Sequence, residues 1–160
     1  MSLVKQSRRF VLAGLAMGLA AAALPSQAAE DVSFNTTYGL ALRGFDPVGY
    51  FTENRAVKGL PTITTTYKGA IYEFASDANK ATFLANPEKY VPQFGGFCAW
   101  ATSQGYKADI DPHAFAINDG KLYVNFADVF LNQFQQDVKG NTAKAEANWA
   151  KVRTLTEIAR

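Results

Sequence analysis

The segment Phe94-Gly95-Gly96-Phe97-Cys98-Ala99-Trp100 gathers the rarest side chains of this sequence in one short stretch. It holds the only cysteine, a pair of adjacent glycines and three aromatic residues. Glycine adopts a positive φ at little cost and lets another chain segment approach the backbone closely. The only histidine follows in Asp111-Pro112-His113. We therefore expect the fold to be organised around this segment, with the Cys98 thiol as a metal ligand, a nucleophile or a buried core side chain.

The N-terminal sequence has the pattern of an export signal. Basic residues at positions 5, 8 and 9 precede an apolar run at 10–24, and small residues follow in Pro25-Ser26-Gln27-Ala28-Ala29. The apolar run is shorter than the roughly 20 residues that span a bilayer as a helix, which favours a cleaved signal peptide. Ser7-Arg8-Arg9-Phe10-Val11-Leu12 resembles the twin-arginine signal of bacterial exporters. We predict a signal peptide at 1–28, cleaved near Ala28, and a periplasmic or secreted protein. An ordinary secretory signal is the alternative.

The rest of the chain is nearly neutral. Removal of the three basic residues at positions 5, 8 and 9 leaves 13 basic against 14 acidic residues. This balance gives no basic face for nucleic acid, and no membrane anchor is expected after cleavage. A single cysteine cannot form an internal disulfide, so packing of the 12 Phe, 7 Tyr and 2 Trp must stabilise the fold. The length suits one domain.

The pattern of apolar residues predicts both strands and helices. Two hairpins are predicted from apolar or β-branched runs around a glycine-containing turn, 62–67 with 70–74 and 114–117 with 122–126. A short strand is predicted at 48–51, after a turn at Asp46-Pro47. Helical spacing predicts helices at 77–85, 87–91, 128–138 and about 141–154. Ser76 is expected to cap the first of these helices, and Gly140 to end the third.

These elements predict an α+β fold, because strands and helices do not alternate strictly along the chain. We expect a small antiparallel sheet built from the two hairpins, packed with short helices and two C-terminal helices. The predicted domain covers residues 40–153, after an N-terminal extension at 29–39 and before a C-terminal tail at 154–160. The stretch 101–111 shows no clear periodicity and is interpreted as a loop.

An ordered series of motifs resembles the YHS domain family. The three motifs are Gly44-Phe45-Asp46-Pro47-Val48-Gly49-Tyr50-Phe51, Gly69-Ala70-Ile71-Tyr72-Glu73-Phe74-Ala75-Ser76 and Phe83-Leu84-Ala85-Asn86-Pro87-Glu88-Lys89-Tyr90. The later positions 95–99, 111–112, 119–123 and Trp149 resemble the exported, single-domain branch of that family. The resemblance extends over residues 40–152. It implies a YHS-like fold for most of the exported chain.

The resemblance also implies a link to metals. YHS domains occur in copper- and heavy-metal-transport proteins, where cysteines are thought to bind the metal. In this sequence Gly49, Ala75 and Asn79 stand near the positions of those cysteines. The family's ligands therefore do not carry over to this chain.

The residues present suggest a different metal site. Cysteine and histidine are suitable ligands for copper or zinc, so Cys98 and His113 are candidate ligands with help from Asp46 and Asp111. Copper is the first candidate. This interpretation makes the protein a metal-linked binding module, provided that folding brings the four side chains together.

Two further functions remain open. A small molecule or a protein could bind without metal in an aromatic pocket, with Asp46 as a polar anchor. Its predicted lining residues are Tyr50, Tyr72, Phe94, Phe97 and Trp100. A thiol enzyme is the other alternative, with Cys98 as the nucleophile and His113 as the base.

Overall fold

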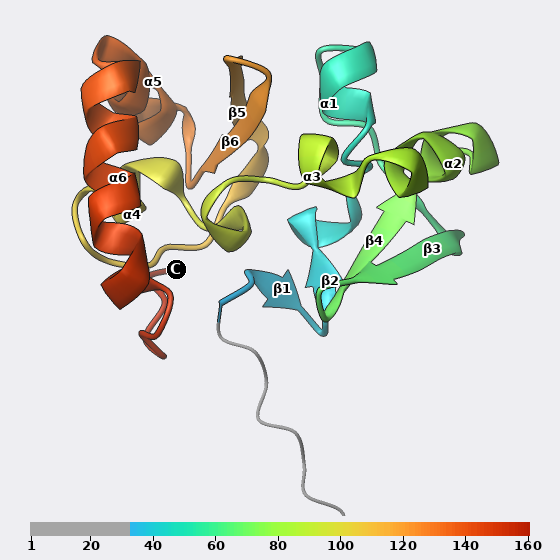
Figure 1. Ribbon diagram of the computed structural model, residues 1–160, viewed down its shortest axis with the longest axis horizontal. Coiled ribbons are helices and arrows are strands. Elements are labelled where there is room, and N and C mark those ends of the chain that lie inside the picture. The colour runs from blue at the N-terminus through green and yellow to red at the C-terminus, as the bar shows by residue number, and fades with distance from the viewer. Residues whose placement is uncertain (1–32) are drawn as a thin grey trace, which may run out of the picture.

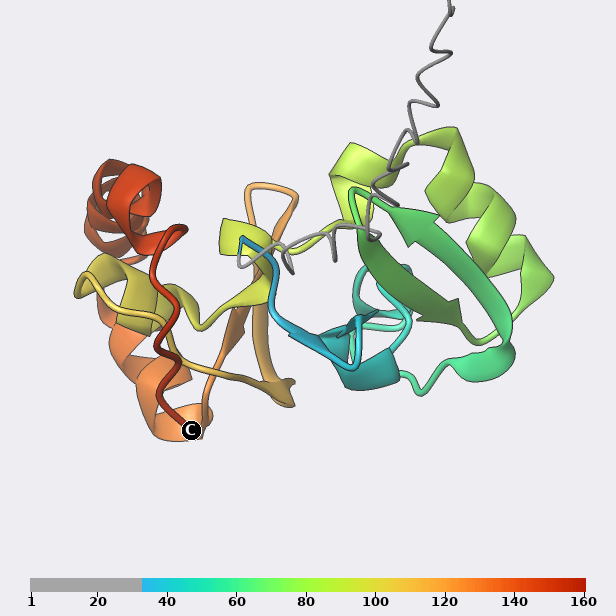
Figure 2. The ribbon, with the colours of Figure 1, turned by 90° about the horizontal axis from the view of Figure 1, so that it is seen from below.

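The computed structural model describes residues 33–160, so the predicted signal peptide and residues 29–32 lie outside the described part. The chain forms two lobes that lie side by side (Figures 1 and 2). The sheet lobe contains β1 (Thr36–Thr37), β2 (Leu40–Ala41), η1 (Leu42–Gly44), α1 (Gly49–Thr52), β3 (Leu60–Tyr67), β4 (Ala70–Phe74), α2 (Asp77–Ala85) and α3 (Pro87–Tyr90). The helical lobe contains η2 (Phe94–Gly96), α4 (Ala99–Ser103), β5 (Asp111–Asn118), β6 (Lys121–Asn125), α5 (Asp128–Gln136) and α6 (Val138–Val152).

The sheet lobe is built on a four-stranded sheet in the order β1-β2-β4-β3. The pair β2–β4 is parallel, whereas β1–β2 and β3–β4 are antiparallel. The predicted hairpin of β3 and β4 is confirmed, and both residues of its turn, Lys68 and Gly69, have positive φ as a type I′ turn requires. The predicted helix α2 is also confirmed. Its N-cap Ser76 accepts a hydrogen bond from the Asn79 N–H at 3.1 Å.

The β5–β6 hairpin forms the wall between the lobes. Its turn at Asp119-Gly120 has positive φ at both residues, as predicted from the sequence. Side chains alternate along β6: Leu122 and Val124 join the core of the sheet lobe, whereas Tyr123 packs among the helices of the other lobe. The α+β class is confirmed. The expected single sheet is not formed, however: β5 and β6 pair only with each other and make a second, two-stranded sheet.

The predicted strand at 48–51 is wrong, because these residues form helix α1. The Asp46 carboxylate accepts a hydrogen bond from the Val48 N–H at 2.8 Å and so turns the chain into the helix. The Thr52 N–H then donates to the Val48 carbonyl at 3.1 Å. A run as short as Val-Gly-Tyr-Phe fits a buried helical turn as well as a strand.

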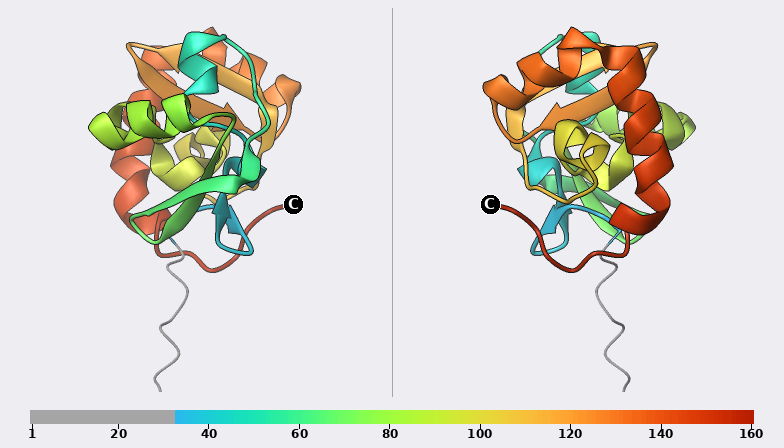
Figure 3. Two further views of the ribbon diagram at one scale, coloured as in Figure 1. Left: turned by 90° about the vertical axis from the view of Figure 1, so that its right-hand side faces the viewer. Right: turned by 90° about the vertical axis from the view of Figure 1, so that its left-hand side faces the viewer.

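The helices of the helical lobe begin and end differently from the prediction. Gly140 does not end a helix; α5 ends at Gln136, and Gly140 lies inside α6. The break comes from Asp137, whose carboxylate accepts the Gly140 N–H at 2.8 Å and caps α6. The predicted loop at 101–111 begins inside helix α4. Figure 3 shows α6 along the outer side of the lobe with α4 beside it.

Both ends of the described chain pack against the helical lobe. The Asn35 N–H donates to the Gly95 carbonyl at 2.8 Å. The C-terminal residues are also ordered, because Ala159 pairs in parallel with Ala108. The buried Lys107 ammonium donates to the carbonyls of Arg153 at 2.9 Å and Leu155 at 2.6 Å, which fixes the end of α6. Among residues 33–160, no helix combines the length and the apolar character that a membrane-spanning helix requires.

Candidate functional site: the groove between the lobes

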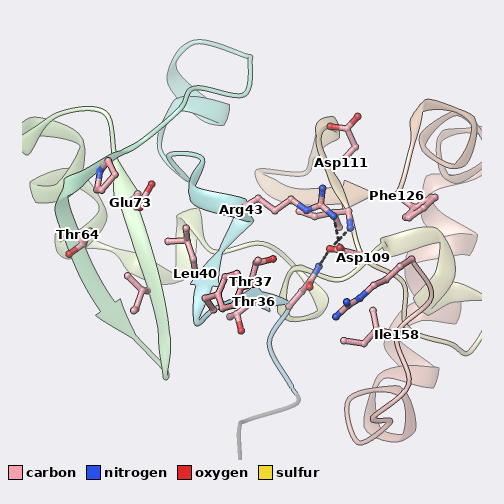
Figure 4. Close-up of a pocket in the computed structure, with 16 residues that line it drawn as sticks. Thr36, Thr37, Leu40, Arg43, Thr64, Glu73, Asp109, Asp111, Phe126 and Ile158 are labelled. Carbon is pink, nitrogen blue, oxygen red and sulfur yellow. Dashed lines mark hydrogen bonds and ion pairs between the residues drawn. The ribbon is translucent and has the colours of Figure 1, made fainter.

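A groove of about 1470 Å³ lies between the lobes, and we call it the interlobe groove (Figure 4). Segments far apart in the sequence line it: residues 35–43 and parts of β3 and β4 on one side, and residues 109–111 with Phe126, Ile158 and Arg160 on the other. Its volume exceeds the roughly 300–1,000 Å³ of pockets that hold one drug-sized molecule. The groove is therefore large enough for an extended or peptide-sized ligand.

An ion pair joins the two lobes at the groove. Arg43, which follows β2, contacts the carboxylate of Asp109, which precedes β5 (Figure 4). Asp109 also accepts hydrogen bonds from the Asn35 side chain at 3.1 Å and from the Ile110 N–H at 2.8 Å. Burial alone would raise the pKa of Asp109, but the hydrogen bonds from Arg43, Ile110 and Asn35 outweigh it and hold this pKa below its usual value. Asp109 is thus an ionised, fully hydrogen-bonded part of the groove wall.

Two further carboxylates line the groove, one on each lobe. Glu73 comes from β4, where Tyr72 and Phe74 face the core. Asp111 begins β5 and accepts only the His113 backbone N–H, at 2.9 Å, among the hydrogen bonds of the described residues. Glu73 and Asp111 lie on opposite sides of the groove in Figure 4. Both lack an ion-pair partner within the part of the chain that the structure describes.

The thiol of Cys98 lies in the interior, with 1% of the residue exposed. Its sulfur accepts the Ala101 N–H at 3.4 Å and thereby caps α4, and it lies 3.7 Å from the Asn125 side-chain oxygen. Burial raises the pKa of the thiol, despite backbone hydrogen bonds from Ala101, Phe126 and Trp100 that act in the opposite direction. A thiol in this setting is a weak nucleophile at neutral pH. Its role in the fold is that of a buried cap.

The other predicted metal ligands lie in separate environments. His113 is exposed, and its ring packs edge-on against Phe45 with centroids 5.3 Å apart. Asp46 is fully buried and its oxygens already accept three N–H groups, from Val48, Ala75 and the Asn79 side chain.

The predicted donor set is therefore not assembled. No group of three or more His, Cys, Asp or Glu side chains that could hold a metal ion occurs in residues 33–160. Cys98 and His113 also differ in access to solvent, since Cys98 is 1% exposed and borders only a small pocket of about 120 Å³, whereas His113 is exposed. The side chains predicted as copper or zinc ligands do not fit such an ion in this arrangement.

The predicted aromatic pocket is not formed either. Tyr50, Tyr72 and Phe97 are core side chains, each no more than 2% exposed, and the half-buried Trp100 lies between two clusters of the helical lobe. The Tyr50 hydroxyl donates to the Pro112 carbonyl at 3.1 Å, and burial raises its pKa. None of these residues lines the interlobe groove. Tyr72 borders a smaller pocket of about 340 Å³, together with Phe94.

Sequence reasoning missed Arg43 and Glu73 as residues of a site. Arg43 is one of 16 basic residues and lies outside the predicted hairpins and helices, so the sequence does not single it out. Glu73 did carry a signal, because it occupies the polar position of an alternating strand, opposite in direction to Tyr72 and Phe74. Only the fold shows that this second face of β4 borders a groove and not open solvent.

The comparisons with known proteins found a family model that matches most of the sheet lobe. The family model of the YHS domain matches residues 48–94. The matched segment runs through α1, β3, β4, α2 and α3 and ends at the start of η2. The chain therefore contains a YHS domain, and the predicted resemblance is confirmed for this part. The comparisons with curated proteins and with solved structures found no match.

Proposed function

We propose that this chain is an exported binding module, which holds a polar ligand in the groove between its YHS domain and its helical lobe, without a metal. The observation that carries the proposal is the groove of about 1470 Å³, whose wall holds the carboxylates of Glu73 and Asp111. Neither carboxylate forms an ion pair within the described residues 33–160. A groove between two lobes with a few converging polar groups is a typical site for ligand binding.

Binding without metal is favoured over the other two interpretations. A thiol enzyme requires a nucleophile within hydrogen-bond reach of its base, yet Cys98 bonds within α4 and to Asn125 while His113 packs on Phe45. The metal-linked role, with copper first, stays a prediction from the sequence. No donor set for it is gathered among the described residues.

The proposal predicts that filling the groove abolishes binding. Ile71 lies on the groove-facing side of β4 and is 37% exposed, so a tryptophan at this position would occupy the groove. Thermal unfolding of the mature protein would be measured with a panel of amino acids, diamines, sugars and tripeptides. A ligand at about 100 times its Kd stabilises the native state by about 2.7 kcal/mol and raises Tm. We expect at least one class of these compounds to raise the Tm of the unmodified protein but not the Tm of Ile71→Trp.

The matched control is Leu84→Trp. Leu84 is exposed on α2 and does not line the groove, so this variant adds the same ring elsewhere on the YHS domain. It should retain the full increase in Tm. The proposal is rejected if no class stabilises the unmodified protein, or if Ile71→Trp responds as strongly as the control.

Export rests on the N-terminal pattern, and it predicts a defined product. The protein from the periplasm should begin at residue 29 or 30, as read by N-terminal sequencing or mass spectrometry. Replacement of Arg8 and Arg9 by lysine keeps the charge but removes the twin-arginine pair, so the precursor should accumulate in the cytoplasm. Undiminished export of this variant would support the ordinary secretory signal, and an uncleaved protein in the cytoplasm of the unmodified strain would contradict export.

A further inference from the structure

We propose that Glu73 binds an ammonium or guanidinium group of the ligand in the interlobe groove. This inference rests on the proposed function and specifies the chemistry of its ligand. A cationic group is the natural partner of a carboxylate that is withdrawn from bulk water but open to a groove. Three observations on the YHS domain support it.

The first observation is a carboxylate without a partner. Glu73 is 8% exposed, so most of the residue is withdrawn from solvent. Across residues 33–160 the Glu73 carboxylate takes part in no ion pair and accepts no hydrogen bond. Its two oxygens still reach solvent, because neither is a buried polar atom that lacks a hydrogen-bond partner, so a ligand in the groove has access to them. The orientation of β4 directs this side chain, like that of Ile71, to the groove.

The second observation is that two glycines leave room around Glu73. A Cβ atom on Gly44 would lie 2.6 Å from the Glu73 Oε2 atom. A Cβ atom on Gly59 would lie 2.5 Å from the Glu73 Cβ atom. The Gly59 N–H donates to the Gly44 carbonyl at 2.9 Å, which holds the two glycines together beside the glutamate. A side chain at Gly44 would displace the carboxylate, whereas one at Gly59 would collide with the backbone of Glu73, so the two glycines together set the position of this glutamate.

The third observation is that the cations near this slot bind other groups. A Cβ atom on Gly44 would lie 3.0 Å from the Lys58 Nζ atom, so this ammonium lies beside the Glu73 carboxylate, although the two form no ion pair within residues 33–160. Lys58 donates instead to the Arg43 carbonyl at 2.8 Å and lies 4.8 Å from the centre of the Phe45 ring. The Arg43 guanidinium is held by Asp109 across the groove (Figure 4). The Glu73 carboxylate thus keeps its capacity for a cation that the ligand supplies.

The experiment compares cationic and neutral probes of the same size. Mature protein labelled with ¹⁵N would be titrated with 1,4-diaminobutane and with the peptide Gly-Lys-Gly, acetylated at its N-terminus and amidated at its C-terminus. Butane-1,4-diol and the peptide Gly-Gln-Gly with the same blocked termini are the uncharged counterparts. The amide signals of Gly44, Gly59, Thr64 and Glu73 should shift with the two cationic probes and not with the neutral ones. The cationic probe that binds with the lower Kd shows whether the ammonium group of the ligand belongs to a free amine or to a peptide side chain.

The matched variants are Glu73→Gln and Asp119→Asn, which remove one negative charge each. Asp119 is exposed in the β5–β6 turn and does not line the groove. We expect Glu73→Gln to weaken binding of 1,4-diaminobutane about tenfold or more, as loss of a charge-assisted hydrogen bond does, and Asp119→Asn to leave it unchanged. The titration of the unmodified protein gives an independent readout if Glu73→Gln folds poorly.

Different failures have different meanings. Equal weakening by both variants, or the same amide shifts with MgCl₂ at matched ionic strength, would overturn the inference, because each indicates general electrostatic attraction. If neutral or anionic probes shift the groove amides and the cationic probes do not, the inference on Glu73 fails and the proposed groove function stands. If no probe shifts groove amides, both fail.

Discussion

Replacement of Asp46 by alanine is expected to destabilise the protein by about 3 kcal/mol or more, because it leaves one buried and two partly buried N–H groups without their acceptor. The Asp46 carboxylate accepts the Val48 N–H and the Ala75 N–H, both at 2.8 Å, and the Asn79 side-chain N–H at 2.6 Å. These donors belong to the start of α1, the end of β4 and helix α2. The loss is a large fraction of the total stability of about 5–15 kcal/mol of a typical domain. Urea unfolding, followed by tryptophan fluorescence, measures it.

Two other variants make this result specific. Asp77→Ala removes an exposed carboxylate from the first turn of α2 and should cost no more than about 1 kcal/mol. Asp46→Asn preserves the shape but turns an NH₂ group toward an N–H donor, so it should fall between the two alanine variants. A cost for Asp46→Ala no larger than that for Asp77→Ala would show that the three hydrogen bonds do not stabilise the YHS domain.

Gly95→Ala should have the second large effect. Gly95 has φ of +61°, and a Cβ atom at this position would overlap the Ser33 carbonyl oxygen. The substitution therefore adds the cost of a left-handed backbone, about 1–2 kcal/mol, to the loss of contact with the N-terminal segment. That segment is held by the hydrogen bond from the Asn35 N–H to the Gly95 carbonyl. We expect a total of about 2–4 kcal/mol in unfolding free energy, and faster hydrogen exchange at Asn35.

Gly120→Ala is the matched control for the cost of placing alanine in a left-handed backbone conformation. Gly120 has φ of +70°, and no atom lies within 4 Å of where its Cβ would be. The difference between the two variants thus isolates the contact between Gly95 and residues 33–35. Equal destabilisation by both, with unchanged exchange at Asn35, would mean that the close approach of the N-terminal segment contributes nothing.

Local patterns predicted much of the fold because the decisive interactions are local. The hairpin turns need positive φ at Lys68-Gly69 and Asp119-Gly120, and the sequence supplies glycine at the second position of each. Ser76 caps α2 through a residue three positions later. The errors arise where a side chain overrides the pattern. Asp46 turns the chain into α1 where a strand was predicted, and Asp137 separates α5 from α6 where Gly140 was predicted to do so.

The site was harder to predict because it depends on distant segments. Sequence reasoning gave weight to rare residue types and so selected Cys98 and His113, which the fold places in different environments. The residues that line the groove are of common types, and Arg43 meets Asp109 across 66 positions of the chain. The two hairpins also belong to different sheets, which no local pattern of either hairpin indicates.

The most direct test of the groove as the ligand site is a crystal structure of the mature protein grown with saturating 1,4-diaminobutane. The account predicts that the diamine lies between the lobes, with one nitrogen about 3 Å from a Glu73 carboxylate oxygen. A diamine bound only outside the groove, with the Glu73 carboxylate untouched, would contradict the account.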